Sequence, residues 1–522
     1  MKTRKHILTF FLLTLFLIFL KSDFRIINEL RCCQDDFDYY SHALTIAQDF
    51  DLDYDNQITS KARFFNESSQ KVAPMGFFGS GLLASPFLFL GVVLDNILNI
   101  EQEFLNYKKL MYSFSSIFYL FISSALLHKT LVNSEKRFSI NLALFGSGII
   151  YFAFERYSMT HAYEVFTVSL VIYFSEKFYR QDSKNKLYSI LLPTAILLGF
   201  LVRWTNYYIV LIPLIISYFI KYKKQKRKLD IYLIVSTISS ILIFALHTKA
   251  IYGYITFSPL EIYGSGAQKA GDVVFDNIFN NFFQIIFEFI KDIFILLFTF
   301  EFGLFWFSPI IFLGFLVAIY KFIFSEIKEK LLFFLVLLCY AQCFFVISIW
   351  NSTASSYGFR YTFSLIPLSI YLVYKIEFNY FQKYINSYIV FFSIFGIFSV
   401  LFFETTLQTQ LSLEPVLNSF GIQKIYSQPD YLTGVIKSFF NPESYLKIGA
   451  TSFLGAIFFK FIIVFFGYNT VLQLTENLGY ANNADLIELI YKINTIELHI
   501  FVTTILISII AIQMLVKNLY KS

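Results

Sequence analysis

The sequence predicts an all-α membrane protein, a polytopic bundle of roughly twelve or thirteen transmembrane helices with amphipathic helices in its first external loop. Two features predict this class. Hydrophobic residues make up 57% of the 522 residues and charged residues 15%, whereas a soluble globular protein carries about 25% charged residues. The apolar residues also form continuous runs, at a mean hydropathy of +0.60, rather than the short alternating segments of a β-barrel.

The chain begins with a basic segment that contains Lys2, Arg4 and Lys5 and continues with unbroken apolar sequence over Ile7–Leu20. No small-residue cleavage site follows, so we expect an uncleaved first span rather than a signal peptide. The basic residues place the amino terminus in the cytoplasm. Farther along, lysine and arginine crowd one set of loops, above all Lys221–Lys228, and are sparse in the other set, which is the positive-inside pattern.

The loops expected outside the membrane are about residues 21–106, 247–300 and 350–361. In the first of them, Met75–Gly91 is apolar but interrupted by glycines and a proline, and we interpret it as an interfacial helix rather than a broken span. The second holds an amphipathic helix from about Asn280. These loops are expected to bring distant parts of the chain to one face of the membrane.

The chain divides into two regions. Residues 1–403 hold the spans and loops with the chemical candidates, and residues 404–522 hold a further external loop and the last transmembrane helices, with no role assigned. The net charge of +6 is confined to short loops, which indicates orientation in the membrane rather than nucleic-acid binding. The cytoplasmic loops contain no nucleotide-binding motif, and four cysteines do not form a disulfide framework.

Three carboxylates directly after the first span are the first chemical candidates. Asp35, Asp36 and Asp38 lie at the membrane edge, where unpaired charge is expensive. In a helix, i,i+3 and i,i+4 spacing places four side chains of this stretch on one face: Asp35, Asp38, Tyr39 and His42. One carboxylate among apolar walls fits a general base, whereas two carboxylates with His42 fit a divalent cation, the one cofactor these residues suggest. A helix cap is the structural alternative.

Arg203 and Arg360 each stand at the external boundary of a span. Arginine binds phosphate bidentately and stays charged in a low-dielectric site, so two converging arginines at headgroup depth suit a lipid-linked phosphate. His161, at the start of a span, is a third candidate for contacting that phosphate. Glu301 is a lone acid beside a span and is expected to pair with an arginine. Interfacial anchoring is the structural alternative for the arginines and the histidine.

Together these segments resemble the GT-C superfamily of polytopic glycosyltransferases, and are most similar to the branch with the protein O-mannosyltransferases and the lipid A aminoarabinose transferases. The resemblance covers most of residues 1–370. It rests on Asp35-Asp36 after the first span and on further blocks in a shared order: Tyr39-Tyr40, Ala43, Asp49–Asn56, Gly79–Pro86, Met159–Phe166, Leu201–Asn206 and Trp350–Pro367. The chain departs from the family at Asp36, where Glu is usual, at Phe37, where Pro is usual, and at Trp204, where Pro often follows the arginine.

The resemblance implies an inverting glycosyltransferase that moves a sugar from a polyprenyl-phosphate donor to a hydroxyl acceptor on the extracytoplasmic face. In that role Asp35 and Asp36 form the catalytic pair, with Asp35 taking the acceptor proton. Arg203, Arg360 and His161 neutralise the leaving phosphate, and Asp38, His42, Glu301 and Tyr39 are supporting candidates.

The partners implied are the lipid-linked donor, membrane lipids and an acceptor, with no nucleic acid. The richness in Lys, Asn, Ile and Phe is typical of an AT-rich genome and favours a bacterial inner membrane. A polytopic transporter, or a flippase or ligase for lipid-linked saccharides, is the alternative. A transferase predicts an external cavity that joins the acid to the two arginines, whereas a transporter predicts a midplane cavity between symmetric halves.

Overall fold

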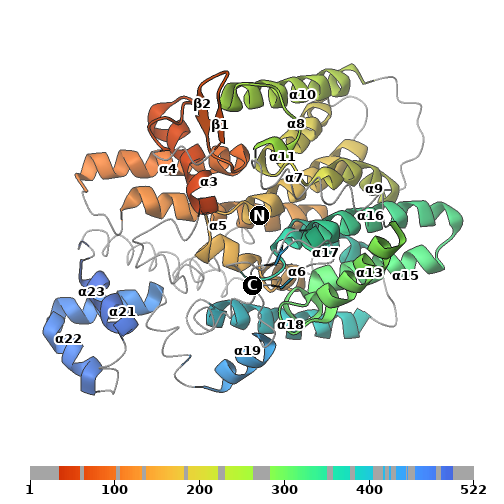
Figure 1. Ribbon diagram of the computed structural model, residues 1–522. Helices are drawn as coiled ribbons and strands as arrows, with labels where there is room; N and C mark the ends of the chain where they lie inside the picture. Colours follow the sequence, from red (N-terminus) through yellow and green to blue (C-terminus); the bar gives the residue numbers. More distant parts are fainter. Residues whose placement is uncertain are drawn as a thin grey trace.

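The structure, a computed structural model, describes most of the chain. The described residues are 34–58, 64–100, 106–131, 137–180, 186–220, 230–262, 282–349, 357–376, 382–403, 416–417, 423–424, 431–441, 444, 453–477, 484–495 and 497. Nearly all of them are helical, and the β-structure within these ranges is confined to two short hairpins. Helices packed against one another form the body of the molecule (Figure 1).

The helices of the first half are α3 (Gln34–Leu44), α4 (Phe78–Leu98), α5 (Tyr107–Thr130), α6 (Arg137–Phe145), α7 (His161–Arg180), α8 (Leu187–Val202), α9 (Ile212–Phe219), α10 (Ile231–Tyr252) and α11 (Pro259–Ile262). Those of the second half are α13 (Phe282–Phe298), α14 (Leu304–Phe307), α15 (Pro309–Phe324), α16 (Ile327–Ile349), α17 (Ile366–Lys375), α18 (Gln382–Phe402), α19 (Tyr431–Phe440), α21 (Phe453–Phe466), α22 (Tyr468–Thr475) and α23 (Ala484–Thr495).

Four short helical segments that are not α-helical lie between these α-helices. Two are π-helical, η1 (Thr45–Asp49) and η3 (Tyr151–Glu155), and two are 3-10 helices, η4 (Tyr207–Leu211) and η5 (Arg360–Leu365). The hairpins pair β1 (Phe64–Asn66) with β2 (Lys71–Ala73) and β3 (Val416–Leu417) with β4 (Gln423–Lys424), each antiparallel.

The predicted class, an all-α membrane protein, is confirmed. Among the described helices, five are long and apolar enough to cross a membrane: α4, α5, α10, and the windows Glu329–Ser348 of α16 and Lys383–Phe402 of α18. Shorter apolar helices occur at Leu187–Val202, Tyr207–Phe219 and Pro309–Phe324. The predicted number of spans stays a prediction, because the first span lies outside the described residues and the last, from Ile496, does so except for Glu497.

Most of Met75–Gly91 lies in α4, which runs unbroken over Phe78–Leu98 with Pro86 inside it. The length and composition of α4 would allow it to cross a membrane, and the interfacial placement expected for this segment stays a prediction. The glycines that seemed to interrupt it are contact points. A Cβ on Gly79 would lie 2.4 Å from the backbone of Leu201 and Val202, and one on Gly81 would lie 2.4 Å from the Cβ of His42. The start of α4 therefore packs directly against α3 and the end of α8.

Helix α7 lies at the centre of the bundle, in contact with α5, α8, α9, α17 and η5. Small hydroxyl side chains allow the close approach of α5, as is common between membrane helices. Ser115 shares a hydrogen bond of 2.6 Å with the Tyr163 hydroxyl, and Ser116 Oγ donates to the carbonyl of Ala153 at 2.7 Å. The first turn of α7 is consequently held deep inside the molecule.

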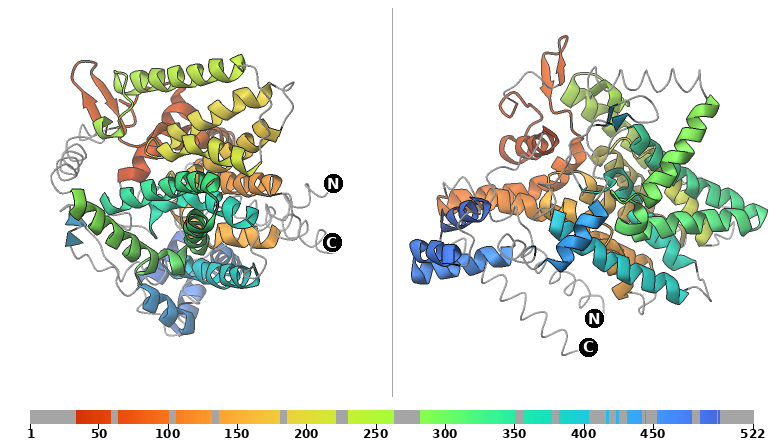
Figure 2. Two further views of the ribbon diagram at one scale, coloured as in Figure 1. Left: turned by 90° about the vertical axis from the view of Figure 1, so that its right-hand side faces the viewer. Right: turned by 60° about the horizontal axis from the view of Figure 1, so that its bottom comes forward.

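The helices near the carboxyl end pack on the first half of the chain. Tyr107, at the start of α5, shares an apolar cluster with Ile463 of α21 and Ile490 of α23. Lys460 Nζ of α21 donates to the Asn494 carbonyl at 2.8 Å and joins α21 to α23. Figure 2 shows these helices, in blue, beside the orange α4 and α5. The amphipathic helix expected from about residue 280 is present as α13.

Candidate functional site

Glu164, in the first turn of α7, is the centre of a buried polar network. Its Oε1 accepts hydrogen bonds from Thr160 Oγ1 at 2.7 Å and Arg203 Nη1 at 2.9 Å, and its Oε2 accepts one from Asn206 Nδ2 at 2.9 Å. His161 Nδ1 also lies 2.9 Å from Oε1. The Glu164 side chain is 1% exposed, so these contacts replace water entirely. Buried charges persist in proteins when they are paired and hydrogen-bonded in this way.

Arg203 follows the last residue of α8 and is fixed on several sides. Besides Glu164, its Nη1 donates to Thr160 Oγ1 at 3.1 Å and its Nε to Thr205 Oγ1 at 3.3 Å. The loop that carries it is braced from α16, where Gln342 Oε1 accepts from the Tyr208 backbone N–H at 2.7 Å and its amide donates to the Thr205 carbonyl. Arg203 is therefore held in one orientation by its neighbours.

Tyr361 lies against two arginines. The guanidinium carbon of Arg203 is 4.4 Å from the centroid of the Tyr361 ring, and that of Arg360 is 5.3 Å from the same centroid. Both distances are within the range of cation–π attraction. Arg203 and Arg360, which are far apart in sequence, are thus brought together on one ring, as the sequence analysis expected of the two arginines.

A left-handed turn directs Arg360 toward this cluster. Gly358 has a φ of +72°, which residues with a Cβ rarely adopt, and its carbonyl accepts from the Arg360 N–H at 3.0 Å. Burial lowers the pKa of the Arg360 guanidinium, but Tyr361 and the Asp35 carboxylate raise it, and the net result is a pKa above the ordinary value. The charge of Asp35 thus reaches Arg360, so the acidic stretch belongs to the electrostatic surroundings of that arginine.

The two neighbouring aspartates have different surroundings. Asp36 is buried and its Oδ2 lies 3.1 Å from Arg156 Nη2, in an ion pair that the sequence analysis did not predict. Asp35 is partly exposed. Both lie in the first turn of α3, where carboxylates favour the start of a helix, so the structural role considered for them applies alongside any chemical one. Arg156 follows the π turn η3, whose wide geometry sets its direction.

The supporting candidates are placed in three different settings. His42 does not join Asp35 as a cation ligand, because its Nδ1 lies 2.7 Å from the Tyr54 hydroxyl and its Nε2 lies 2.9 Å from the Gly76 carbonyl. Burial lowers the pKa of His42 to about 4. Asp38 and Tyr39 are buried beside Gly76, and Glu301 lies in a turn that packs on α19. Within the described ranges no three His, Cys, Asp or Glu side chains are grouped to hold a metal ion.

His161 is also buried, and its position changes what it can do. The ring packs edge-on against Phe152, with centroids 4.5 Å apart, and also lies near Tyr361 and Phe363. Its Nε2 has no hydrogen-bond partner among the described residues. If the Nδ1 that faces Glu164 carries the proton, then Nε2 of the neutral ring accepts a hydrogen bond rather than donating one. Such a ring suits a hydroxyl group better than a phosphate oxygen.

Sequence reasoning missed Glu164, Tyr361 and the pairing of Arg156. Glu164 is an acid within an apolar helical stretch, and an ionisable residue in such a stretch is a functional candidate by default, so a signal was present. Arg156 stood in a segment assigned to the external face, with nothing to indicate its partner. Tyr361 was one of 36 tyrosines, and nothing in the sequence distinguished it.

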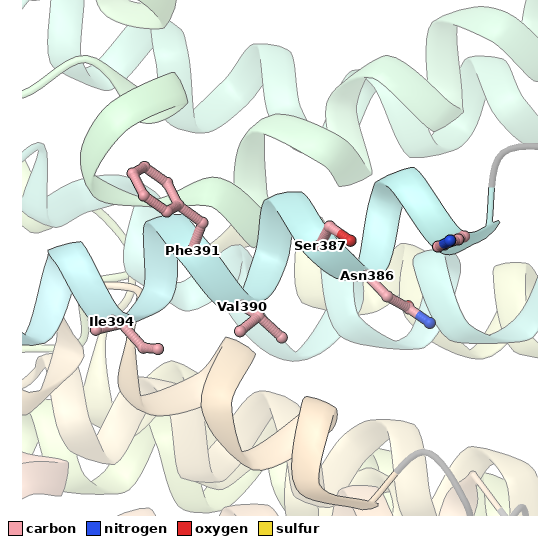
Figure 3. Close-up of a pocket in the computed structure, with 6 residues that line it drawn as sticks. Asn386, Ser387, Val390, Phe391 and Ile394 are labelled. Carbon is pink, nitrogen blue, oxygen red and sulfur yellow. The ribbon is translucent and has the colours of Figure 1, made fainter.

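An open groove lies on one face of α18, lined by Lys383, Asn386, Ser387, Val390, Phe391 and Ile394 (Figure 3). None of the candidate residues lines it. No family model, no curated protein and no solved structure matches the chain. The interpretation of the site therefore depends on its own geometry.

Proposed function

We propose that the chain is an inverting glycosyltransferase, which transfers a sugar from a polyprenyl-phosphate donor to a hydroxyl acceptor on the extracytoplasmic side of the membrane. The observation that supports it most is the gathering of residues from distant parts of the chain. Asp35 of α3 acts on Arg360 of η5, and Arg360 shares the Tyr361 ring with Arg203. An acid whose charge reaches one of two guanidiniums that share a ring fits proton removal from an acceptor beside a phosphate that leaves with growing charge.

In the proposed reaction the acceptor oxygen attacks the anomeric carbon and forms the new glycosidic bond. The bond from that carbon to the phosphate oxygen breaks on the opposite face, so the configuration inverts. Asp35 takes the acceptor proton, because it is partly exposed and can be reached by an acceptor, whereas Asp36 is buried against Arg156. Arg360 and Arg203 face the phosphate of the polyprenyl lipid, which leaves as the free monophosphate.

The site lies at the ends of helices rather than in their middle, which favours a transferase over a transporter. His161 and Glu164 open α7, Arg203 follows the end of α8, and Arg360 opens η5. Transporters commonly place ionisable groups near the midplane of the bilayer, between internal repeats. The transferase is therefore the function that the geometry supports best.

The test is transfer by the purified full-length chain in lipid nanodiscs, supplied with polyprenyl-phosphate sugars and with a cell-envelope extract as the source of the hydroxyl acceptor, and assayed for released polyprenyl monophosphate. Asp35→Asn is expected to lower the rate about 10²–10⁴-fold, as the loss of a general base does. Asp55→Asn, on the exposed loop after α3, makes the same change away from the site and is expected to keep the rate. Near-full transfer by Asp35→Asn would show that Asp35 is not the base.

A second measurement addresses the activity itself. Mass spectrometry of cell-envelope glycans from cells with and without the protein is expected to show the loss of one sugar modification. Unchanged glycans, together with no turnover of any polyprenyl-phosphate sugar, would overturn the transferase proposal.

A further inference from the structure

The Tyr361 ring has no role in the chemistry proposed above, yet it contacts both cations of the site. The guanidinium carbons of Arg203 and Arg360 both lie within 5.3 Å of its centroid. Arg203 comes from the end of α8, whereas Arg360 is the neighbour of Tyr361 in η5. One side chain thus joins two cationic groups that the fold brings from separate elements.

Of the two arginines, Arg203 is the fixed one. Its Nη1 donates to Glu164 at 2.9 Å and to Thr160 at 3.1 Å, and its Nε donates to Thr205 at 3.3 Å. The Tyr361 ring consequently rests on a guanidinium whose position is set by α7. Its own backbone belongs to a tight helical turn that opens after Gly358, so the ring is fixed from both sides.

The two guanidiniums repel each other, since the charge of Arg203 acts to lower the pKa of Arg360, and the repulsion favours rotamers in which they separate. The negative face of an aromatic ring attracts each of them and opposes that separation. A phosphate oxygen is best bound when both groups are already in place, because no side-chain entropy is then lost on binding. The Tyr361 ring is thus suited to keep the guanidiniums of Arg203 and Arg360 in position before a phosphate binds.

We propose that Tyr361 is a positioning residue, whose ring holds the guanidiniums of Arg203 and Arg360 together so that both bind the phosphate of the lipid-linked donor. The proposal rests on the proposed function and adds to it the residue that prepares the phosphate site. The ring face is the active part of Tyr361, and its hydroxyl is dispensable. Tyr361→Phe should therefore behave as the wild type, and Tyr361→Leu should not.

The probe is a C55 polyprenyl monophosphate, the product shared by all donors of this class whatever their sugar, with the polyprenyl alcohol as the uncharged comparison. Binding is measured by thermophoresis on the full chain in nanodiscs. Tyr361→Leu is expected to raise the Kd for the phosphate about tenfold, the effect of losing such cation–π contacts, and to leave the Kd for the alcohol unchanged. Tyr361→Phe is expected to stay within about twofold of the wild type.

In the transfer assay, Tyr361→Leu should raise KM for the donor and also lower kcat, because the phosphate gains negative charge as the bond breaks and the two guanidiniums stabilise that charge. Tyr232→Leu is the matched control, since Tyr232 also lies under a cation, with Lys186 Nζ 4.1 Å from its centroid, but outside the site. It is expected to change neither Kd nor KM. A Tyr361→Leu variant with lower thermal stability but with the KM and kcat of the wild type would contradict the positioning role.

A second substitution separates the ring's electronics from its shape. Tyr361→pentafluorophenylalanine keeps a six-membered ring but reverses the polarity of its face, and it is expected to weaken phosphate binding as Tyr361→Leu does. Equal affinity of this variant and Tyr361→Phe would overturn the inference even if Tyr361→Leu fails to fold. Wild-type protein that binds no polyprenyl phosphate would instead overturn the proposed function.

Discussion

Arg203 and Glu164 form a buried ion pair, with Nη1 of the arginine 2.9 Å from Oε1 of the glutamate, although they stand 39 positions apart in the sequence. The pair ties the end of α8 to the start of α7. Thr160 and Asn206 complete the hydrogen bonds of the carboxylate. The end of α8, which carries one arginine of the proposed phosphate site, is thereby fixed to the buried first turn of α7.

Glu164→Gln is expected to destabilise the protein by about 3 kcal/mol, because removal of one partner leaves the buried Arg203 charge uncompensated. The measurement is the thermal midpoint of the detergent-solubilised protein, followed by tryptophan fluorescence. Glu176→Gln, on the same helix, is the control, since its partners Arg180 and Lys375 are partly exposed and the pair contributes less. Equal losses from the two variants would contradict the account of Glu164.

Asp36 and Arg156 are expected to depend on each other. Asp36→Asn and Arg156→Gln should each lower the thermal midpoint and the free energy of unfolding. The double variant should lose less free energy of unfolding than the sum of the two single losses, and the difference, the coupling energy, should be about 1–3 kcal/mol. Asp35→Asn is expected to lower transfer with a smaller effect on stability, because Asp35 is partly exposed. Additive losses from the double variant would show that the contact at 3.1 Å carries no energy.

Gly79 allows α4 to touch the end of α8, so Gly79→Ala is expected to force the two apart. Its new methyl group would lie 2.4 Å from the backbone of Leu201 and Val202, and overpacking of this kind costs about 1–3 kcal/mol. Gly199→Ala is the matched change on α8, where the new methyl would meet the flexible end of Ile209 at 2.9 Å. The thermal midpoint should fall clearly for the first variant and little for the second.

His42 is expected to make stability depend on pH. Burial lowers its pKa from 6.5 to about 4, so the folded state binds this proton less readily than the unfolded state. The contribution of neutral His42 to the free energy of unfolding is fully present above pH 6.5. It is lost as the pH falls toward and through about 4, and the loss is at most on the order of 3 kcal/mol. His42→Gln removes the titration. The difference in thermal midpoint between the wild type and His42→Gln should become smaller as the pH falls from 6.5 toward 4. A difference that stays constant over this range would show that His42 does not make stability depend on pH.

The helical membrane class could be predicted because it follows from the composition and from the length of the apolar runs. Neither of these depends on how the helices pack against one another. The approach of Arg203 to Arg360 could be predicted from sidedness, since loops on one face of a membrane are confined to a thin layer. The structure brings these residues together, while their chemical roles stay predictions.

The partners within the site could not be predicted, because they depend on helix phase and on contacts between elements. Asp35 and Asp36 are equivalent in the sequence, and the difference between them arises when Arg156 reaches one of them. In the sequence, the glycines of α4 suggest a break in the helix. In the structure, they allow a close contact with the neighbouring helix, where Leu201 lies beside Gly79. His42 suggests a metal ligand until both of its nitrogens are occupied by Tyr54 and Gly76.

The π turn η3 has a consequence for tolerance to changes in chain length. Each residue advances a helix by about 100°, and a π turn carries one residue more than the α-helical turn it replaces. A deletion of a single residue within Tyr151–Glu155 would convert the turn to ordinary helix and rotate Arg156 away from Asp36. An equal deletion at Glu67–Ser68, in the exposed turn between β1 and β2, would leave that alignment intact. The number of residues in this segment is thus constrained, in addition to its buried side chains.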